Sequence, residues 1–394
     1  MTNRRLQVHY CCVQGAYWIL AAIMSGFMTP ILQAKGFSSM EIGILLAVKH
    51  ISSIFVQMWV ADFSDRHADR IPLKYIIGTG LLIGIIATGV FYSCPENFIT
   101  AVFLFLIFGS TINIIVSFID AMSIQYINSG KNISYTMARG CGSFTWAVSS
   151  IFLGRYADQY GAAKLLLVQM GISFLLFMII LTIQPAQVVE QANHKKQKVE
   201  VHSIGYLLKN YPGYTLFLLS CVLTTICYNT GSCFLIDIVK ATGGGESEYG
   251  IVCFVLAIVE IPTAVFFMKM KEIVGLNRLL MIFTISNTLK AAVLFFATNV
   301  YAIYFDQIFE MLGFGLFYAG SVFFVMEQLP SEDVVKGTTL ITVAVNGIGT
   351  GVGSMICGWI MSVLGLKALL GSGIMFGAAG IFIMSLAMSE KSRP

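Results

Sequence analysis

Long apolar segments recur along the whole chain and set the first limit on its fold. Twelve runs are mostly apolar and have the length of about 20 residues that an α-helix needs to cross a bilayer. They lie at 10–32, 41–61, 73–92, 98–127, 138–157, 161–183, 214–236, 249–268, 279–297, 301–326, 338–363 and 368–388. Charged residues make up only 11% of the chain, against about 25% in soluble domains, which excludes an ordinary soluble enzyme and a nucleic-acid-binding protein. We therefore predict an all-α integral membrane protein with twelve transmembrane helices.

A single long polar stretch, at 184–210, separates the first six runs from the second six. It contains His194-Lys195-Lys196-Gln197-Lys198 and is typical of a flexible linker. We therefore expect an N-terminal six-helix bundle at 1–183, a linker at 184–210 and a C-terminal six-helix bundle at 211–394. The charged loop at 62–70 recurs after the eighth run, at 269–278, which indicates two parallel repeats with a substrate site between them near the midplane of the membrane.

Lysine and arginine are distributed unequally between the alternate loops. Sixteen lie on the side of the N-terminus and five on the other side, which predicts that both termini and the linker are cytoplasmic. The first run is too long for a signal peptide and has no small-residue cleavage site. Nine cysteines show no disulfide or zinc spacing, and the glycine-rich run at 347–353 favours close helix packing over nucleotide binding. We expect no cofactor.

Ionisable residues inside the predicted spans are the strongest functional signal. Each costs about 2.5 to 3.5 kcal/mol at the centre of a helix, so we expect these groups to pair and to line a polar cavity. The group consists of Lys49, Asp120, Arg139, Glu260, Lys290, Asp306 and Glu310. Four acids against three bases leave one acid without a cationic partner, and that acid would hold a proton. Such a proton can couple transport to a proton gradient.

The depth of these residues in their spans suggests partners. Asp120 and Arg139 lie about 11 to 12 Å from the same cytoplasmic turn and can meet, either as a substrate site or as a structural clamp. Asp306 and Glu310 are four residues apart and would share one face of the tenth span, with Lys290 on the neighbouring helix as the partner of Glu310. The pair of Lys290 and Glu310 likewise has either a functional role, in proton coupling, or the role of a structural clamp.

Two further residues have alternative roles that the sequence leaves open. Trp146 follows Arg139 by two helical turns, so it is either an aromatic platform beside the cavity or a packing residue. Lys49 either enters the cavity or extends its ammonium group to the membrane surface.

The two-bundle layout resembles the major facilitator superfamily, and the charges resemble those of lactose permease and related oligosaccharide:proton symporters. The segment at 137–147 is similar to the fifth helix of that group, whose arginine and tryptophan bind galactoside. This resemblance implies that Arg139 holds sugar hydroxyls and that Trp146 stacks on the sugar ring. Asp120 then falls, after one inserted residue, where the group has the acidic partner of its arginine.

The resemblance extends to the C-terminal half. Glu260 resembles the acid on the eighth helix that recognises sugar, although its spacing differs. Glu310 matches the proton-carrying glutamate, and Lys290 stands where an arginine assists its deprotonation. Gln307 replaces the histidine of the group, Asp306 and Lys49 are additions, and two further ion pairs of the group are neutral here.

We therefore predict a secondary active transporter that carries a small hydroxylated solute, foremost a sugar or oligosaccharide, together with a proton by alternating access. Asp120, Arg139, Trp146, Glu260 and Gln307 would bind the substrate. Proton coupling would involve Glu310, Lys290, Asp306 and Lys49, and Asp65 and Arg66 would gate the cytoplasmic side. The alternatives are a nucleoside or aromatic-acid proton symporter and a drug efflux antiporter. We expect a monomer in the cytoplasmic membrane, in contact with lipid.

Overall fold

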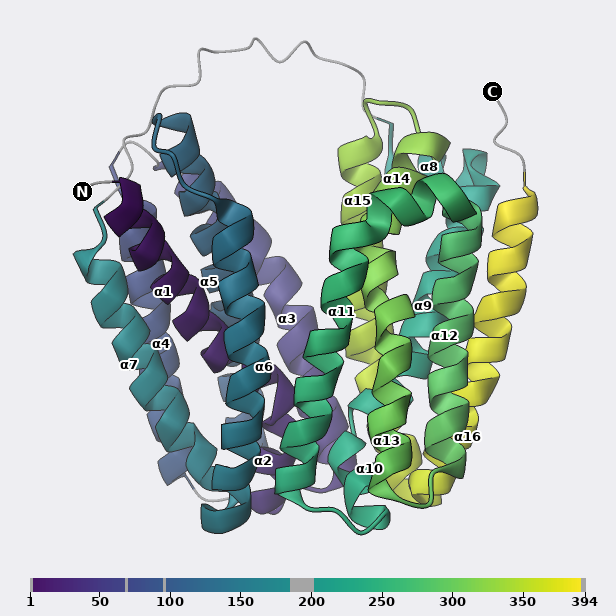
Figure 1. The fold of residues 1–394 in the computed structure, drawn as a ribbon, viewed down its shortest axis with the longest axis horizontal. Coiled ribbons are helices and arrows are strands. Elements are labelled where there is room, and N and C mark those ends of the chain that lie inside the picture. The colour runs from purple at the N-terminus through teal and green to yellow at the C-terminus, as the bar shows by residue number, and fades with distance from the viewer. Residues whose placement is uncertain (1–2, 68–69, 95–96, 185–201, 391–394) are drawn as a thin grey trace. The chain divides into compact units, whose positions relative to one another are not determined.

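The computed structural model describes residues 3–67, 70–94, 97–184 and 202–390 (Figure 1). Every regular element in these residues is a helix and none is a strand, so the all-α prediction is confirmed. The chain divides into two compact units. The first consists of Met1–His194 and Tyr249–Ala257, and the second of Lys195–Glu248 and Ile258–Pro394.

The first unit contains the six N-terminal spans. Its elements are α1 (Asn3–Ala21), the π-helix η1 (Ala22–Gly26), α2 (Met28–Ala34), α3 (Ser39–Arg66), α4 (Leu73–Ser93), α5 (Phe98–Asn128), α6 (Tyr135–Tyr160), the short 3₁₀-helix η2 (Ala162–Lys164) and α7 (Leu165–Thr182). Helix α1 packs against α6 and α7, while α5 packs against α3 and α4. The rings of Phe91, Phe105 and Phe108 meet edge to face in the core, with centroids 5.4 to 5.8 Å apart.

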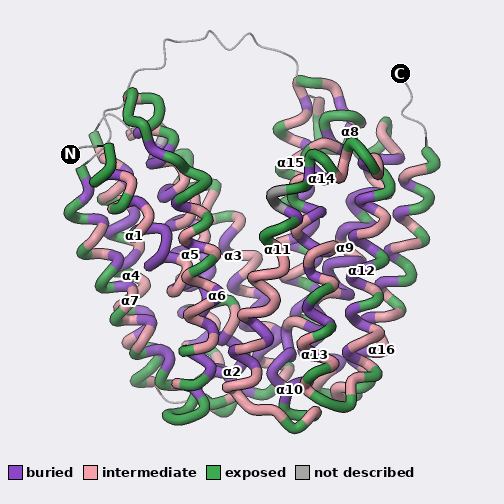
Figure 2. Tube along the Cα trace, in the orientation of Figure 1, coloured by how far each residue is buried: buried purple, intermediate pink, exposed green. Residues whose placement is uncertain are grey.

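The second unit contains most of the C-terminal half. Its elements are α8 (Ile204–Asn210), α9 (Pro212–Ser232), α10 (Leu235–Ala241), α11 (Glu246–Val274, shared with the first unit), α12 (Leu276–Phe296), α13 (Val300–Asp306), the 3₁₀-helix η3 (Gln307–Leu312), α14 (Phe314–Gln328), α15 (Val334–Thr342), the π-helix η4 (Val343–Val352) and α16 (Gly353–Ser389). Helix α9 packs against α12, η4 and α16 and is largely buried (Figure 2). Tyr214, Phe217, Phe283 and Phe317 form the aromatic centre of this core.

Nine helices in the described residues are long and apolar enough to cross a membrane. Helix α11 adds a tenth if its two segments, which bend near Pro262, form one span. Helix α6 is not among them because Arg139 and many small polar residues lower its hydropathy. The last segment, Val334–Ser389, contains two spans because Gly365 interrupts it with a φ of 80°. The described residues thus accommodate the twelve predicted spans.

The second span of each half begins with the same turn and the same helix cap. A glycine with positive φ precedes each span, Gly36 at 86° and Gly243 at 87°. Five residues later, Glu41 and Glu248 accept hydrogen bonds from the backbone N–H of their N-cap residues at 2.8 and 2.7 Å. A carboxylate at this position satisfies an otherwise unpaired N–H group of the first helical turn. The same turn chemistry therefore begins α3 and α11.

Several predicted spans are interrupted. The first continues from α1 through η1 into α2, the seventh is divided into α9 and α10, and the tenth into α13, η3 and α14. In the tenth span, Gly313 has a non-helical φ of −89° and ψ of −122°, which ends the 3₁₀ turn. In the predicted linker, the last seven residues form α8 with Leu207 buried. Residues 185–201, including His194–Lys198, lie outside the described residues.

Candidate functional site

In the first unit, α1, α5 and α6 bring together a group of polar and aromatic side chains. Asp120 on α5 accepts a hydrogen bond from the Gln14 amide at 3.0 Å. Arg139 on α6 lies over the Trp18 ring, with its Cζ 3.8 Å from the ring centroid. Among the described residues no carboxylate lies within 4.0 Å of the Arg139 guanidinium, so the expected direct pair of Asp120 and Arg139 is not formed. A neutral amide and an indole ring take the place of the ion pair.

Sequence reasoning missed Gln14 and Trp18. The Trp18 indole N–H donates to the Gln14 Oε1 at 3.0 Å, and Gln14 Nε2 also donates to the Tyr10 hydroxyl at 3.1 Å. The available signal was their spacing, because Tyr10, Gln14 and Trp18 follow one another at intervals of four and so share one face of a helix. A buried glutamine on that face is a polar residue within a span and marks a site.

Two other predicted residues of the first unit lie near the π-helix η1. Lys49 is only 5% exposed and donates to the Met24 carbonyl inside η1, so its ammonium group does not extend to the membrane surface. Trp146 is half-buried and lies near Gly26, since a Cβ on that glycine would be 3.7 Å from the Trp146 ring. Trp18, and not Trp146, is the tryptophan that covers Arg139.

In the second unit, Lys290 and Glu310 form the expected buried ion pair. The Lys290 ammonium donates to Glu310 Oε2, and the two residues are 6% and 1% exposed. The ammonium also lies 5.3 Å from the centroid of the Tyr228 ring. The acid and the base thus compensate each other away from solvent.

Asp306 and Gln307 lie next to this pair and are fully buried. The Gln307 amide donates to Asp306 Oδ2 at 3.0 Å and to the Ile303 carbonyl at 3.3 Å. The remaining oxygens, Asp306 Oδ1 and Gln307 Oε1, are buried without a hydrogen-bond partner. Such acceptors are costly to leave unpaired, which distinguishes this place from ordinary packing.

The sequence predicted that Asp306 and Glu310 share one face of a continuous α-helix, and this prediction is wrong. Asp306 ends α13, and Glu310 belongs to the 3₁₀ turn η3. Two side chains from other helices donate hydrogen bonds to carbonyl groups of this turn. Ser286 donates to the Phe309 carbonyl at 2.8 Å, and Thr263 donates to the Met311 carbonyl. Neighbouring helices thus stabilise the break that positions Glu310.

Glu260 lies half-buried on α11, the helix that also carries Thr263. Its charge interacts electrostatically with Lys290, and the backbone of α11 approaches Gly315 on α14 closely. Glu260, Lys290, Asp306, Gln307 and Glu310 therefore form one group in the second unit, whereas Asp120, Arg139, Trp146 and Lys49 belong to the first.

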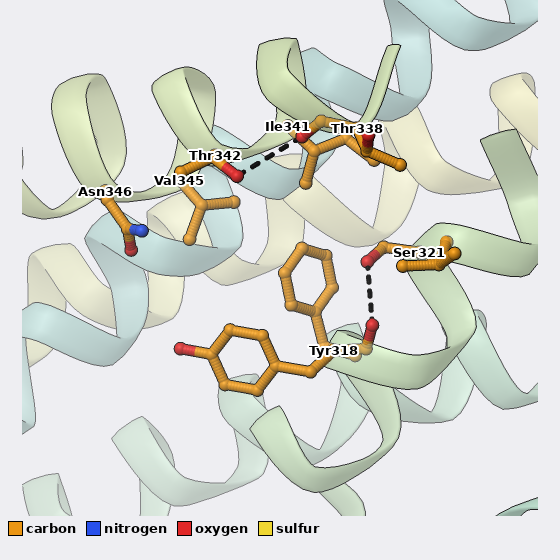
Figure 3. Close-up of a pocket in the computed structure, with 9 residues that line it drawn as sticks. Tyr318, Ser321, Thr338, Ile341, Thr342, Val345 and Asn346 are labelled. Carbon is orange, nitrogen blue, oxygen red and sulfur yellow. Dashed lines mark hydrogen bonds between the residues drawn. The ribbon is translucent and has the colours of Figure 1, made fainter. Parts of the chain in front are cut away.

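A pocket of about 140 Å³ lies within the second unit, between α14 and the α15–η4 segment (Figure 3). Tyr318 and Ser321 line one wall, and Thr338, Thr342 and Asn346 line the other. Ser321 donates to the Tyr318 carbonyl at 3.3 Å, and Thr342 to the Thr338 carbonyl at 3.2 Å. Apolar side chains complete the lining: Phe317, Val322, Ile341 and Val345. The pocket is therefore mostly apolar, with a few hydroxyl and amide groups and no formal charge.

The predicted gating residues lie at the end of α3. Arg66 is exposed and pairs with Asp62 one turn earlier, with a distance of 2.8 Å between nitrogen and oxygen. The side chain of Asp65 lies outside the described part of the chain. Arg66 therefore has a partner within its own helix in this structure.

Comparisons with known proteins agree with this architecture. A profile of the MFS_1 like family matches residues 10–370. A search of curated proteins finds no match. Among solved structures, the chain is similar to the nucleoside transporter NupG, with a TM-score of 0.83 and 14% identity over 98% of this chain and 100% of that one. It is also similar to a bacterial homologue of the human lysosomal transporter Spinster, with a TM-score of 0.69 and 13% identity over 98% of this chain and 96% of that one. At these identities the likeness shows the fold.

Proposed function

The chain belongs to the MFS_1 like family of the major facilitator superfamily, and from this premise we propose that it is a proton-coupled symporter of a small hydroxylated solute. The family and the fold make it a multi-span membrane transporter. The observation that carries the proton coupling is the buried group of Lys290, Glu310 and Asp306 at the break in the tenth span. Two acids and one base, all buried, need one further positive charge to be neutral.

A proton is the simplest source of that charge. Burying an unpaired carboxylate is strongly unfavourable, so one of the two acids is expected to be protonated while the group is closed to water. When the same group opens to the less acidic side, the proton can leave. Glu310 is the proposed carrier because it matches the proton-carrying glutamate in the sequence resemblance. Its protonation would release Lys290 from the ion pair and leave that ammonium to compensate Asp306, which ends the adjacent helix α13.

The polar groups of both units support a hydroxylated solute. Asp120 and Arg139 offer an acceptor and a donor in the first unit, and the pocket between α14 and α15 offers hydroxyl and amide groups in the second. The sequence resemblance favours a sugar or oligosaccharide. A nucleoside is the second candidate, because the likeness to the nucleoside transporter NupG coincides with aromatic rings at both places, Trp18 and Tyr318.

The test is solute-driven proton movement in liposomes loaded with a pH-sensitive dye. The panel contains mono- and disaccharides, glycosides, nucleosides and aromatic acids, added to purified protein. Acidification of the liposome interior with sugars supports sugar symport, and a signal restricted to nucleosides moves the assignment to the second candidate. Solute uptake without proton movement would contradict the coupling.

Glu310→Gln separates coupling from binding. The amide keeps the shape of the side chain but carries no exchangeable acid, so accumulation against a gradient should be lost while exchange of labelled for unlabelled solute persists. Ser385→Ala, at an exposed position of α16, is the control and should accumulate solute normally. Preserved uphill uptake in Glu310→Gln would contradict the role of Glu310.

We also propose that both termini face the cytoplasm of a cell bounded by this membrane, because basic residues are concentrated in the loops on that side. A protease-cleavable tag at either end should be cut only in inverted membrane vesicles. Cleavage in intact cells would reverse the orientation.

A further inference from the structure

The hydrogen bonds of Gln14 have only one consistent direction. The indole N–H of Trp18 can only donate, so it requires the Gln14 oxygen, and an ionised Asp120 can only accept, so it requires the Gln14 amide nitrogen. The Tyr10 hydroxyl donates to the Ile119 carbonyl at 2.9 Å and is left to accept from the same nitrogen. Gln14 is fully buried, so its amide is held between these three partners.

Arg139 is held by a ring face. Its guanidinium lies over Trp18, and Gly142, one turn later on α6, leaves the space for that ring. A Cβ on Gly142 would come within 2.2 Å of the Trp18 Cδ1. Arg139 Nη1 is buried and has no hydrogen-bond partner. A guanidinium on an aromatic face keeps its N–H edge available, whereas a bidentate ion pair with Asp120 would occupy that edge.

We propose that Gln14 and Trp18 are positioning residues of the solute site. Gln14 occupies Asp120 and keeps it from pairing with Arg139, and Trp18 holds the guanidinium so that its N–H edge faces the solute. The inference rests on the proposed function in one respect, namely that the solute binds at Asp120 and Arg139. Its physical content, the separation of the two charges, can be tested without a solute.

The first test measures how fast phenylglyoxal modifies Arg139 in the purified protein. Peptide mapping at successive times gives the modified fraction of this residue. An arginine in an ion pair reacts more slowly than an unpaired one. In Gln14→Leu, Asp120 loses the Gln14 amide and keeps the Tyr135 side chain as a neighbouring hydrogen-bonding group, so it can pair with Arg139. Modification should then slow about fivefold, the effect of a partly exposed ion pair. Adding Asp120→Asn should restore the original rate. Arg155, exposed on the same helix, is the internal control in every variant.

An unchanged rate in Gln14→Leu would overturn the proposal, and so would slow modification that persists after Asp120→Asn is added. Thermal unfolding of each variant establishes that it is folded. If Gln14→Leu does not fold, Gln14→Met, which keeps the length of the side chain, decides the matter. It also removes the amide that donates to Asp120, so Arg139 modification should slow unless the proposal is wrong.

The second test measures transport of lactose and uridine, as probes of the two solute classes, in proteoliposomes. Trp18→Leu should raise KM about tenfold with little change in maximal rate, because it removes both the ring face and the indole donor. Trp18→Phe keeps a ring face and should raise KM only about twofold to threefold. Trp359→Phe, at an exposed position of α16, should leave KM unchanged. An unchanged KM in Trp18→Leu would overturn the role in solute binding.

The two tests fail separately. If the wild-type protein transports neither probe, the proposed solute classes are wrong, and the modification rates still decide whether Gln14 separates the charges. If transport is normal but Gln14→Leu does not change the modification rate of Arg139, the proposed function is supported and the positioning role of Gln14 is wrong.

Discussion

Lys290 and Arg139 show two ways of keeping a cation inside a helical bundle. Lys290 is compensated by a carboxylate that is itself buried, so each partner depends on the other. Arg139 lies on an indole ring, and the carboxylate nearest in depth is bound by an amide. The first arrangement suits a group that exchanges one proton, and the second suits a group that must remain available to a solute.

Removing Lys290 alone should destabilise the protein more than removing both partners. Lys290→Met leaves Glu310 buried without a counter-charge, and breaking a buried pair in this way costs about 3 to 5 kcal/mol. The double variant Lys290→Met, Glu310→Gln should recover most of that loss. Thermal unfolding in detergent measures both. Lys240→Met, which breaks the partly exposed pair with Glu246, is the control and should cost less than about 1 kcal/mol.

Two glycines on α6 should respond in opposite directions to alanine. Gly142→Ala places a methyl group against the Trp18 ring and should lower the unfolding temperature and shift tryptophan fluorescence. Around Gly140 a Cβ would meet nothing within 4 Å, so Gly140→Ala should raise stability by up to about 1 kcal/mol through helix propensity. Equal effects at the two positions would show that Trp18 does not occupy the space beside Gly142.

Candidate residues often lie in, or contact, an irregular part of a helix. Lys49 contacts the π-helix η1, Glu310 lies in the 3₁₀ turn η3, and Asn346 lies in the π-helix η4. Irregular backbone frees carbonyl groups that lipid cannot satisfy, so neighbouring side chains must do so. Asn229 on α9 does this for η4 by donating to the Gly349 and Thr350 carbonyls at 3.0 and 3.3 Å.

The same reasoning predicts which residues maintain the break in the tenth span. Ser286→Ala and Thr263→Val each remove the donor to one carbonyl of η3 and should cost about 1 to 3 kcal/mol, since the carbonyl stays buried. Because η3 carries Glu310, uphill uptake should fall as well. Ser385→Ala removes a hydroxyl that only serves its own exposed helix and should change neither property. Normal stability and uptake in both break variants would refute the argument.

At the scale of the molecule, the chain that joins the two halves is attached to the second unit. The His202 backbone N–H donates to Asp333 Oδ1 at 3.1 Å, and its ring Nδ1 lies 2.7 Å from Oδ2. Lys336 donates to the His202 carbonyl, and Asp333 is fully buried at the start of α15. This arrangement holds the beginning of α8 against the turn between α14 and α15.

Asp333→Ala should release that attachment. Losing hydrogen bonds to a buried carboxylate should cost about 2 to 3 kcal/mol, and proteolysis within 202–210 should become faster. Thermal unfolding and timed digestion measure the two effects. Glu332→Gln, at the neighbouring and less buried position, is the matched control. Identical digestion of the wild type and Asp333→Ala would mean that His202 is held by other contacts.

The sequence by itself determined the fold class, the number of spans and the pairing of Lys290 with Glu310. Spans follow from the length of apolar runs, which the bilayer sets, and the pair follows from the depth of two charges on neighbouring antiparallel helices. The glycine run at 347–353 was also interpreted correctly as a packing surface, since a Cβ on Gly349 would lie 2.7 Å from the Thr225 side chain.

Only the tertiary structure decided where the helices break and which neutral residues contact the charged side chains. Gln14 and Trp18 took the place of a predicted ion pair because α1 lies between the side chains of α5 and α6, a fact that depth along single helices does not contain. The break at Glu310 depends on donors from α11 and α12, which are distant in sequence. The pattern of apolar residues along one helix indicates which of its faces contacts lipid. The hydrogen-bond partners of a side chain depend on which helices are neighbours, and the pattern of one helix does not contain this information.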